Sequence, residues 1–487
     1  MNSKHKPTFE QNAAVEMSTK NISFKLAAFA GAGKTSTLQL INEAKGNKKG
    51  IYLAFNKVIA LEAQKKFNSH VKCQTFHSLA YEQVPSHITT KLNNSRLMPS
   101  TLESLFNLKK VSLPKAKDPK SSMPCSGTEQ IYIIERAIKN FCSSNTTVPT
   151  IEQVIQAMPS WVNKDYSGGL ATKLLPHVHA YWSMSIGKQY DFKISHDIYL
   201  KFWALTNPSI PFDYILQDEA QDIDRLMLQI HRNQESQIIM VGDKHQNIYE
   251  WRGTTNAMRD YKAPELSLTK SFRFGGQVAD TANLILRKML NEKVKLIGNK
   301  DIQSTVGNTD DIDTYIVRTN AGGFKLALQL ISIGKKPRLE VDTKNLISQI
   351  EDSIKLQNNG TISKNSAFYG FTDWNDVSGY VEGNPTTDIA PLVNLINKNN
   401  PLFLLNVLSK LSNNNDNDVL IITAHKSKGS EYSRVQLADD FEWNENNKEK
   451  ALLTQEESRL LYVASTRAIN HLDYSNIGEL FERMKKI

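Results

Sequence analysis

Short apolar runs recur along the chain, and glycine-rich or polar segments follow them. The runs have the length of buried strands, and most are separated by helical patterns such as the one that begins at Ser36. Strands that alternate with helices predict parallel sheets, so the expected fold class is α/β. The runs occupy residues 22–28, 50–55, 212–217, 237–243, 314–319 and 419–423.

Two regions interrupt this alternation and predict helical insertions into two α/β cores. Residues 85–200 are mostly helical in pattern, and residues 334–418 are helical and rich in asparagine. The polar run 413–418 predicts a linker into the strand that follows it. The expected domains are a first core from 1–84 and 201–265, its insertion 85–200, a second core from 266–333 and 419–487, and its insertion 334–418.

Composition and charge narrow the class of protein. The net charge of +9 and the pI of about 9.1 favour an anionic polymer as partner. The three cysteines lack C-x-x-C spacing, which argues against a disulfide framework, a zinc site or an iron–sulfur cluster. No segment has the apolar length of a membrane span or a signal core. We therefore expect a soluble, intracellular protein, cytoplasmic if bacterial or phage-type and nuclear if eukaryotic.

A glycine loop joins the first apolar run to a helical pattern, as in a phosphate-binding loop. Gly31 and Gly33 allow backbone N–H groups to face a triphosphate, the Lys34 ammonium can reach the β- and γ-phosphates, and the Thr35 hydroxyl can hold Mg²⁺. The first position of the motif is Ala28 instead of glycine, and a tight turn beside an exposed lysine is the alternative. The residues expected to contact the nucleotide here are Ala30, Gly31, Ala32, Gly33, Lys34, Thr35 and Ser36.

Two adjacent acids follow the apolar run 212–217, at the strand end where α/β sheets place their ligands. Asp218 can hold the Mg²⁺ that bridges the phosphates, and Glu219 can orient and deprotonate the attacking water. A solvated acidic loop is the alternative. Gln217 is unusual, because a polar side chain at the end of a buried strand needs a partner.

A series of short segments in a fixed order accompanies the glycine loop. They are 9–14 (FEQNAA), the glycine loop itself, 52–57 (YLAFNK), 74–81 (QTFHSLAY), 218–222 (DEAQD), 241–253 (VGDKHQNIYEWRG), 268–275 (LTKSFRFG), 423–431 (TAHKSKGSE) and 456–468 (EESRLLYVASTRA). Their order resembles that of the motifs of the UvrD/Rep group of superfamily 1 helicases, and their residues are most similar to the helicase part of F-box DNA helicases. The family has two RecA-like P-loop domains, called 1A and 2A, with insertions 1B and 2B. No F-box precedes the first motif, so a ubiquitin-ligase role is not implied.

In a helicase the nucleotide should lie between two folds, with the second fold supplying cations that sense the γ-phosphate. We therefore expect Arg273 and Arg467 to stabilise charge on the transferring phosphoryl group, with a structural ion pair as the alternative for each. The resemblance also implies that Gln246 couples the γ-phosphate to the DNA side, unless it is a plain surface glutamine. It further implies that the nucleotide contacts Gln11 at the base edge, Phe272 by stacking (unless it is core), Glu431 at the ribose, and Gly429.

Single-strand binders combine aromatic platforms with donors to the backbone. Trp251 lies in a polar, basic setting and matches the family's base-stacking tryptophan, although a core position is the alternative. The other residues implied to line the DNA path are Phe55, Asn56, Thr75, His77 and His425.

The resemblance implies an ATP-dependent translocase and helicase that moves 3′ to 5′ on single-stranded DNA and engages junctions between single and double strands. One alternative is a translocase that strips bound proteins from DNA. Another is a DNA-sensing ATPase subunit of a larger assembly, for example in anti-phage defence, in which hydrolysis is a switch. RNA as substrate is disfavoured, because the motif sequences are those of DNA enzymes. A protein partner would bind through 1B or 2B, and the chain ends too soon after the last motif for a fused nuclease to be expected.

Overall fold

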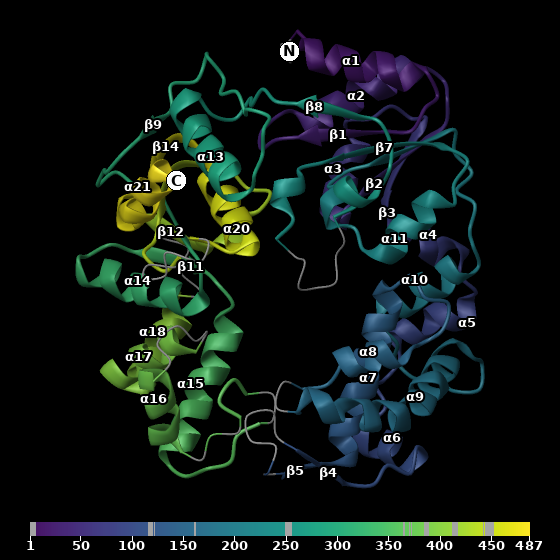
Figure 1. The fold of residues 1–487 in the computed structure, drawn as a ribbon, viewed down its shortest axis with the longest axis vertical. Coiled ribbons are helices and arrows are strands. Elements are labelled where there is room, and N and C mark those ends of the chain that lie inside the picture. Colours follow the sequence, from purple (N-terminus) through teal and green to yellow (C-terminus); the bar gives the residue numbers. More distant parts are fainter. Residues whose placement is uncertain are drawn as a thin grey trace. The chain divides into compact units, whose positions relative to one another are not determined.

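Two six-stranded sheets, each with parallel strands, organise the part of the chain that the computed structural model describes (Figure 1). The chain divides into two compact units, Met1–Ala28 with Lys34–Leu268 and Phe29–Gly33 with Thr269–Ile487. The two sheets confirm the predicted α/β class with two RecA-like cores. The described residues are 6–114, 120, 122–159, 162–248, 256–363, 366–369, 371, 373–383, 389–411, 417–441, 443 and 452–487.

The first sheet takes strands from both sides of the first predicted insertion. Its strand order is β3 (Val71–Thr75), β2 (Gly50–Ala54), β6 (Tyr214–Gln217), β7 (Gln237–Gly242), β1 (Phe24–Ala28) and β8 (Glu265–Leu268). The strands β2, β6 and β7 are buried along their whole length, as expected for parallel strands covered on both faces. Because the strands are parallel, the segments that follow β1, β6 and β7 emerge at one edge of the sheet.

Short helices connect these strands, and several begin at the residues predicted to bind ligands. Among them, α2 begins at Lys34, while Asn56 and Thr75 are the N-caps of α3 and α4. The helices of this core are α1 (Phe9–Thr19), α2 (Lys34–Lys45), α3 (Lys57–Gln64), α4 (Phe76–Gln83), η2 (Ala220–Asp222), α11 (Arg225–Arg232), η3 (Lys244–Gln246) and α12 (Ala257–Asp260).

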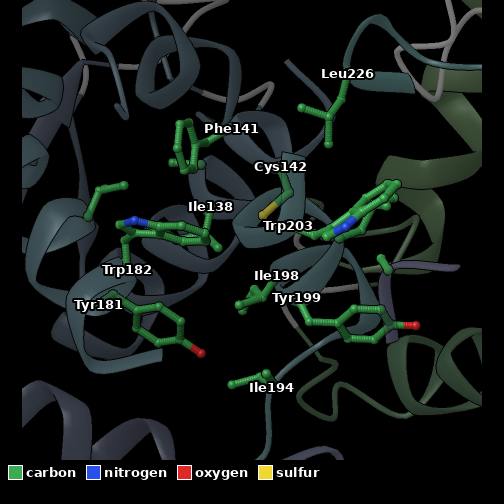
Figure 2. Packing of buried hydrophobic residues seen from close by; sticks show 14 of the residues in the cluster. Ile138, Phe141, Cys142, Tyr181, Trp182, Ile194, Ile198, Tyr199, Trp203 and Leu226 are labelled. Atoms are coloured by element: carbon green, nitrogen blue, oxygen red, sulfur yellow. The ribbon is translucent and has the colours of Figure 1, made fainter. Parts of the chain in front are cut away.

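The first insertion is mostly helical, as predicted, and adds a two-stranded antiparallel hairpin. Its core is aromatic: the rings of Phe141 and Trp182 meet edge to face with centroids 5.0 Å apart, beside the buried Cys142 (Figure 2). Its elements are α5 (Ser86–Thr89), η1 (Thr90–Asn93), α6 (Pro99–Leu105), β4 (Val111–Pro114), β5 (Ser122–Cys125), α7 (Gly127–Ser143), α8 (Ile151–Gln156), α9 (Lys164–Ile186) and α10 (His196–Leu205).

The second sheet belongs to the second unit. Its strand order is β11 (Pro337–Glu340), β12 (Val419–Thr423), β10 (Thr314–Val317), β13 (Tyr432–Leu437), β14 (Ala468–Asp473) and β9 (Thr305–Val306). The helices of this core are α13 (Gly276–Met289), α14 (Asn320–Ser332), α19 (Ala424–Ser427), α20 (Gln455–Ser465), η5 (Ser475–Ile477) and α21 (Gly478–Lys486). The second insertion consists of α15 (Thr343–Gln357), α16 (Trp374–Gly383), α17 (Ala390–Lys398) and α18 (Pro401–Leu411).

Two domain boundaries lie a few residues from their predicted positions. β8 pairs with β1 and extends the first core to Leu268, and β11 pairs with β12 although it lies in the range predicted for the helical insertion. Both are edge strands in which buried and exposed residues are mixed, so neither has a continuous apolar run. Among the described residues, no helix has the length and apolar character needed to cross a membrane.

Candidate nucleotide and nucleic-acid site

The glycine loop has the backbone conformation that its sequence predicts. It follows β1, and Gly31 and Gly33 have φ values of +71° and +74°, which favour glycine. The Ala32 N–H donates to the Phe29 carbonyl at 3.1 Å, which closes the turn before α2 begins. The residues Ala30 and Ala32 are buried. The N-terminus of α2, which includes Thr35 and Ser36, is thus a helix end of the kind that attracts phosphate.

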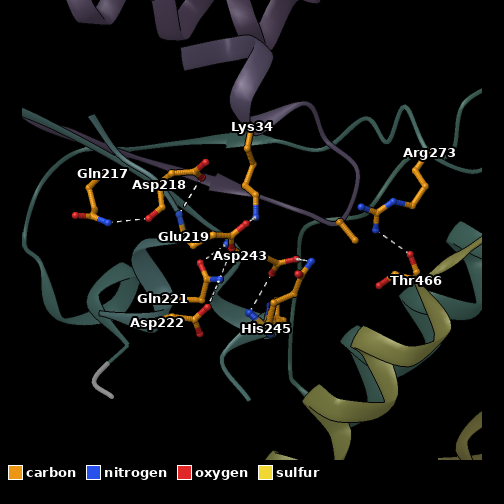
Figure 3. A network of polar contacts seen from close by, with 12 residues as sticks. Lys34, Gln217, Asp218, Glu219, Gln221, Asp222, Asp243, His245, Arg273 and Thr466 are labelled. Atoms are coloured by element: carbon orange, nitrogen blue, oxygen red, sulfur yellow. Dashed lines mark hydrogen bonds and ion pairs between the residues drawn. The ribbon is translucent and has the colours of Figure 1, made fainter. Parts of the chain in front are cut away.

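Lys34 faces the two acids that follow β6 (Figure 3). Its Nζ lies 2.6 Å from Glu219 Oε1, and the Glu219 N–H donates to Asp218 Oδ1 at 2.9 Å. Burial opposes the charge of Lys34, but the attraction of Glu219, Asp218 and Asp243 is stronger in sum, so the Lys34 pKa is raised. Burial and the neighbouring Glu219 raise the pKa of Asp218 against the attraction of Lys34. The Lys34 ammonium is therefore paired with Glu219 and is also attracted by Asp218 and Asp243.

The side chain of Gln221 holds this acidic cluster together. Gln221 Nε2 donates to Glu219 Oε2 at 2.6 Å and to Asp222 Oδ2 at 3.2 Å, while its Oε1 accepts from the Asp243 N–H at 3.1 Å. Gly242 permits this approach, since an added Cβ would lie 2.4 Å from Gln221 Oε1. Gln221 thus connects the segment after β6 to the segment after β7.

Gln246, the predicted coupling residue, is 5% exposed and is not a plain surface glutamine. Its Nε2 donates to Asp243 Oδ2 at 2.9 Å, and Asp243 Oδ1 accepts from the His245 N–H at 3.0 Å. Asp243 also acts electrostatically on Lys34. Gln246 is therefore linked to the acidic cluster through Asp243. Sequence reasoning missed Gln221 and Asp243, although both lie inside segments already matched to motifs.

The cluster has the donor chemistry that Mg²⁺ prefers when phosphate oxygens complete its shell. Asp218 is 4% exposed, and the Tyr52 hydroxyl donates to its Oδ2. In the described part of the chain, no group of three or more His, Cys, Asp or Glu side chains is arranged to hold a metal. The residues present fit an ion that takes one carboxylate, one hydroxyl from Thr35, phosphate oxygens and water.

Gln11 is also buried, and its contacts are local. Its Oε1 accepts from the Thr8 N–H at 3.0 Å in a capping box at the start of α1, and its Nε2 donates to Thr37 Oγ1 at 3.1 Å on α2. These bonds attach α1 to the helix that follows the glycine loop. The role of Gln11 at a nucleotide base stays a prediction.

In the second unit, Arg273 is held by two acceptors. Its Nη2 lies 2.7 Å from Glu431 Oε1, and its Nη1 donates to the Thr466 carbonyl at 2.9 Å. Glu431, predicted to bind ribose, is therefore the ion-pair partner of Arg273 here. Phe272 is half-buried with Lys270 Nζ 5.7 Å from its ring centroid, and Gly429 has a φ of +89°.

Arg467 differs from Arg273 because its side chain is 1% exposed. Its Nε donates to the Val463 carbonyl at 2.9 Å, its Nη1 to the Ser430 carbonyl at 3.1 Å and its Nη2 to Thr466 Oγ1 at 3.2 Å. Each of these three bonds is formed with a neutral oxygen atom of the same unit. The action of both arginines on a phosphoryl group stays a prediction.

The residues predicted to line the DNA path in the first unit lie at the ends of neighbouring strands. Phe55 follows β2 and is 49% exposed. Asn56 Oδ1 accepts from the Ile59 N–H at 2.9 Å, and Thr75 Oγ1 accepts from the Ser78 N–H at 3.1 Å. Because β2 and β3 are adjacent and parallel, these caps emerge at the same edge of the sheet.

The two histidines predicted on the DNA path lie on different helices. His77 Nε2 is 3.7 Å from Asp197 Oδ1, and the proximity of His77 is the chief cause that lowers the pKa of Asp197. His425 is half-buried on α19 of the second unit. Trp251 lies outside the described residues, so its predicted stacking role is untouched by these observations.

Comparison with known families gives two matches. Residues 11–252 match the AAA domain family AAA_19, and residues 198–477, more than half of the chain, match the UvrD-like helicase C-terminal domain. Together they span every motif from Gln11 to Arg467.

Curated relatives agree with these matches. F-box DNA helicase protein 1 of Schizosaccharomyces pombe is 31% identical over 92% of this chain and 55% of the relative. F-box DNA helicase 1 of Gallus gallus is 27% identical over 91% of this chain and 46% of the relative. A probable DNA helicase II homolog of Mycoplasma genitalium is 27% identical over 32% of this chain and 25% of its own length. The chain thus spans about half the length of the two F-box relatives.

Proposed function

Because the chain belongs to the UvrD-like helicase family, as its motif order predicts, we propose that it is an ATP-dependent DNA helicase that moves along single-stranded DNA. The observation that carries this proposal is the cluster of Lys34, Asp218 and Glu219 beside a glycine loop and a helix N-terminus. This arrangement supplies a cation for phosphate and two carboxylates with separate roles.

The hydrolysis step requires one group that accepts a proton and others that stabilise negative charge. Glu219 accepts a proton from water as the water oxygen bonds to the γ-phosphorus and the bond to the β–γ bridging oxygen breaks. Lys34 would contact the phosphates, and Thr35 and Asp218 would hold Mg²⁺, which would neutralise phosphate charge. Arg273 and Arg467 stabilise the charge that develops on the transferring group.

Around the nucleotide, we assign Ala30, Gly31, Ala32, Gly33 and Ser36 to phosphate contacts. The assignments for Gln11, Phe272, Gly429 and Glu431 rest on family resemblance. Because Glu431 forms an ion pair with Arg273, a ribose hydroxyl and the Arg273 guanidinium would compete for the Glu431 carboxylate.

On the nucleic-acid side, the proposed contacts are spread over both units. The capping residues Asn56 and Thr75 present an amide and a hydroxyl group, respectively, at one sheet edge, and Phe55, next to Asn56, presents an exposed ring. An exposed ring next to polar donors suits a single strand, because every base has a π-face and every nucleotide a phosphate. We assign the same function to His77, Trp251 and His425, and we propose that junctions with duplex are the preferred substrate.

The direction of movement is proposed to be 3′ to 5′. The deciding experiment measures ATPase activity with and without single-stranded DNA, and then unwinding of duplexes with a 3′ or a 5′ tail. We expect DNA to stimulate the ATPase and only the 3′-tailed duplex to be unwound. If DNA stimulates the ATPase but strands do not separate on bare or protein-coated DNA, the protein is a DNA-sensing ATPase and not a helicase. An ATPase indifferent to DNA would overturn the proposal.

A further inference from the structure

Gln217 is the polar residue whose position at the end of β6 required a partner, and it lies in a buried network, of which Figure 3 shows the contact with Asp218. Its side chain is 1% exposed, and its Nε2 donates to the Asp218 carbonyl at 2.7 Å and to the Leu53 carbonyl at 3.3 Å. Its Oε1 lies 2.9 Å from His231 Nε2, and His231 on α11 is 0% exposed.

These contacts determine the proton positions. Both partners of Gln217 Nε2 are carbonyl oxygens, so the amide must direct its NH₂ group toward them and its oxygen toward His231. His231 must therefore carry its proton on Nε2 to donate to that oxygen. Burial lowers the pKa of His231 to about 3, which is consistent with a neutral ring that has one donor nitrogen.

The Asp218 carbonyl belongs to the peptide bond that precedes Glu219. Glu219 has a φ of +47°, a left-handed conformation that is unfavourable for a residue with a side chain. The Asp218 N–H donates to the Leu53 carbonyl at 3.1 Å, so the backbone of Asp218 is held through both its N–H and its carbonyl. A rotation of the following peptide would break the bond to Gln217 and redirect the Glu219 side chain.

The same network reaches the segments assigned to DNA. The His231 ring meets Phe76 edge to face with centroids 5.1 Å apart, and Phe76 lies between Thr75 and His77 at the start of α4. Leu53, which shares its carbonyl between Gln217 and Asp218, lies two residues before Phe55. A displacement of either segment would therefore act on the Gln217 amide.

We propose that Gln217 and His231 are positioning residues for hydrolysis: Gln217 fixes the peptide that aims the Glu219 carboxylate, and His231 holds Gln217 in contact with the segment that begins at Phe76. This inference rests on the proposed function. Neither residue touches the reacting atoms. Removal of either changes the turnover rate, and the change is larger for the DNA-stimulated rate than for the basal rate.

The test compares Gln217→Leu, His231→Phe and His231→Gln with the unmodified protein, with kcat and KM for ATP measured with and without single-stranded DNA. We expect Gln217→Leu to lower the stimulated kcat at least tenfold with KM changed less than about twofold, since a misplaced catalytic group costs up to about 10²-fold. His231→Phe should lower it less. His231→Gln keeps a donor at the position of Nε2 and should restore the rate to within about twofold.

Gln130→Leu is the matched control, because Gln130 in the first insertion is 3% exposed and its Nε2 also donates to two carbonyls, of Lys109 at 2.8 Å and Cys125 at 3.4 Å. Its kcat should be unchanged even where its melting temperature falls. Full stimulated kcat in Gln217→Leu, or equal rates for His231→Gln and His231→Phe, would overturn the positioning role. An unmodified protein without DNA-stimulated ATPase would instead overturn the proposed function. Should Gln217→Leu fail to fold, the two His231 variants still decide.

Discussion

Lys34 Nζ and Glu219 Oε1 lie 2.6 Å apart, which places the proposed phosphate-binding lysine in an ion pair with the candidate catalytic base. The side chains of Lys34 and Glu219 are 17% and 23% exposed, so water screens the pair only in part. The raised pKa of Lys34 keeps its ammonium charged at any working pH. A triphosphate that binds Lys34 must then compete with Glu219, and this competition would leave the carboxylate ionised and available to a water molecule.

The Glu219→Gln variant should bind ATP and fail to hydrolyse it. Loss of a general base lowers kcat by a factor on the order of 10² to 10⁴, while an amide preserves size and the bond from Gln221. Lys34→Ala should abolish turnover as well, and both variants should keep most of their affinity for single-stranded DNA. Turnover and nucleotide binding are measured separately.

Glu16→Gln is the control for that substitution, because Glu16 forms an exposed pair with Lys20 at 3.1 Å on α1. Glu16→Gln should leave both turnover and nucleotide binding unchanged. Full hydrolysis by Glu219→Gln would show that another group activates the water.

Arg467→Ala should lower kcat for ATP more than it lowers nucleotide affinity, because an arginine finger acts mainly on charge in the transition state. The variant should also melt earlier, since three hydrogen bonds from a buried guanidinium are lost. Equal losses in rate and affinity, compared at a temperature where the variant is folded, would assign Arg467 to binding or structure.

The pair of Arg273 and Glu431 allows a sharper comparison in the same unit. Arg273→Ala removes the guanidinium, whereas Glu431→Gln removes the ionic partner and leaves the bond from Arg273 to the Thr466 carbonyl. We expect Arg273→Ala to reduce kcat by a factor on the order of 10³ or more. Glu431→Gln should reduce it much less and raise KM if Glu431 binds ribose. Similar kcat losses in both variants would mean that Arg273 acts only through its ion pair.

His231 predicts a specific loss of stability in acid. Burial lowers its folded pKa from 6.5 to about 3, so the unfolded chain takes up the proton first. The contribution to the free energy of unfolding is complete above pH 6.5 and is lost as the pH falls toward 3. Its full size is roughly 4 to 5 kcal/mol. Denaturant unfolding of the unmodified protein and His231→Phe at several pH values isolates the contribution, because other buried acids such as Asp224 act in both proteins. If the free energies of unfolding of the two proteins changed in parallel with pH, the predicted contribution of His231 would be contradicted.

Trp251→Ala should weaken binding of single-stranded DNA by about 1 to 3 kcal/mol, the usual loss of one stacking platform. It should also reduce the DNA-stimulated ATPase more than the basal ATPase, because Trp251 lies five residues after Gln246 in the chain. Trp443→Ala is the control, since the Trp443 ring lies 4.8 Å from the Arg483 guanidinium carbon in the second unit and has no assigned DNA role. Early melting of Trp251→Ala with normal DNA affinity would identify a core tryptophan.

Much of the fold followed from local pattern, because parallel strands buried on both faces need continuous apolar runs. The runs 50–55 and 237–243 became β2 and β7 to within one residue, and the strand at Val419–Thr423 has the predicted bounds. Strands that mix buried and exposed residues were missed, both at sheet edges (β3, β8, β9 and β11) and in the interior of the second sheet (β13 and β14). The glycine loop was also predictable from sequence, since a positive φ at Gly31 and Gly33 depends mainly on the residue being glycine.

Contacts between distant segments were decided only by tertiary structure. The sequence by itself determined that Asp218 and Glu219 follow a buried strand and that Gln217 needs a partner. It did not identify His231 as that partner, Gln221 as the link to Asp243, or Glu431 as the acceptor for Arg273, because a hydrogen bond depends on where two chain segments meet. Burial was decided in the same way: Arg467 is enclosed while Glu431 is half exposed, although both belong to motifs of similar polarity. Local composition sets which side chains are able to pair, and the packing of parallel strands at one sheet edge sets which of them do.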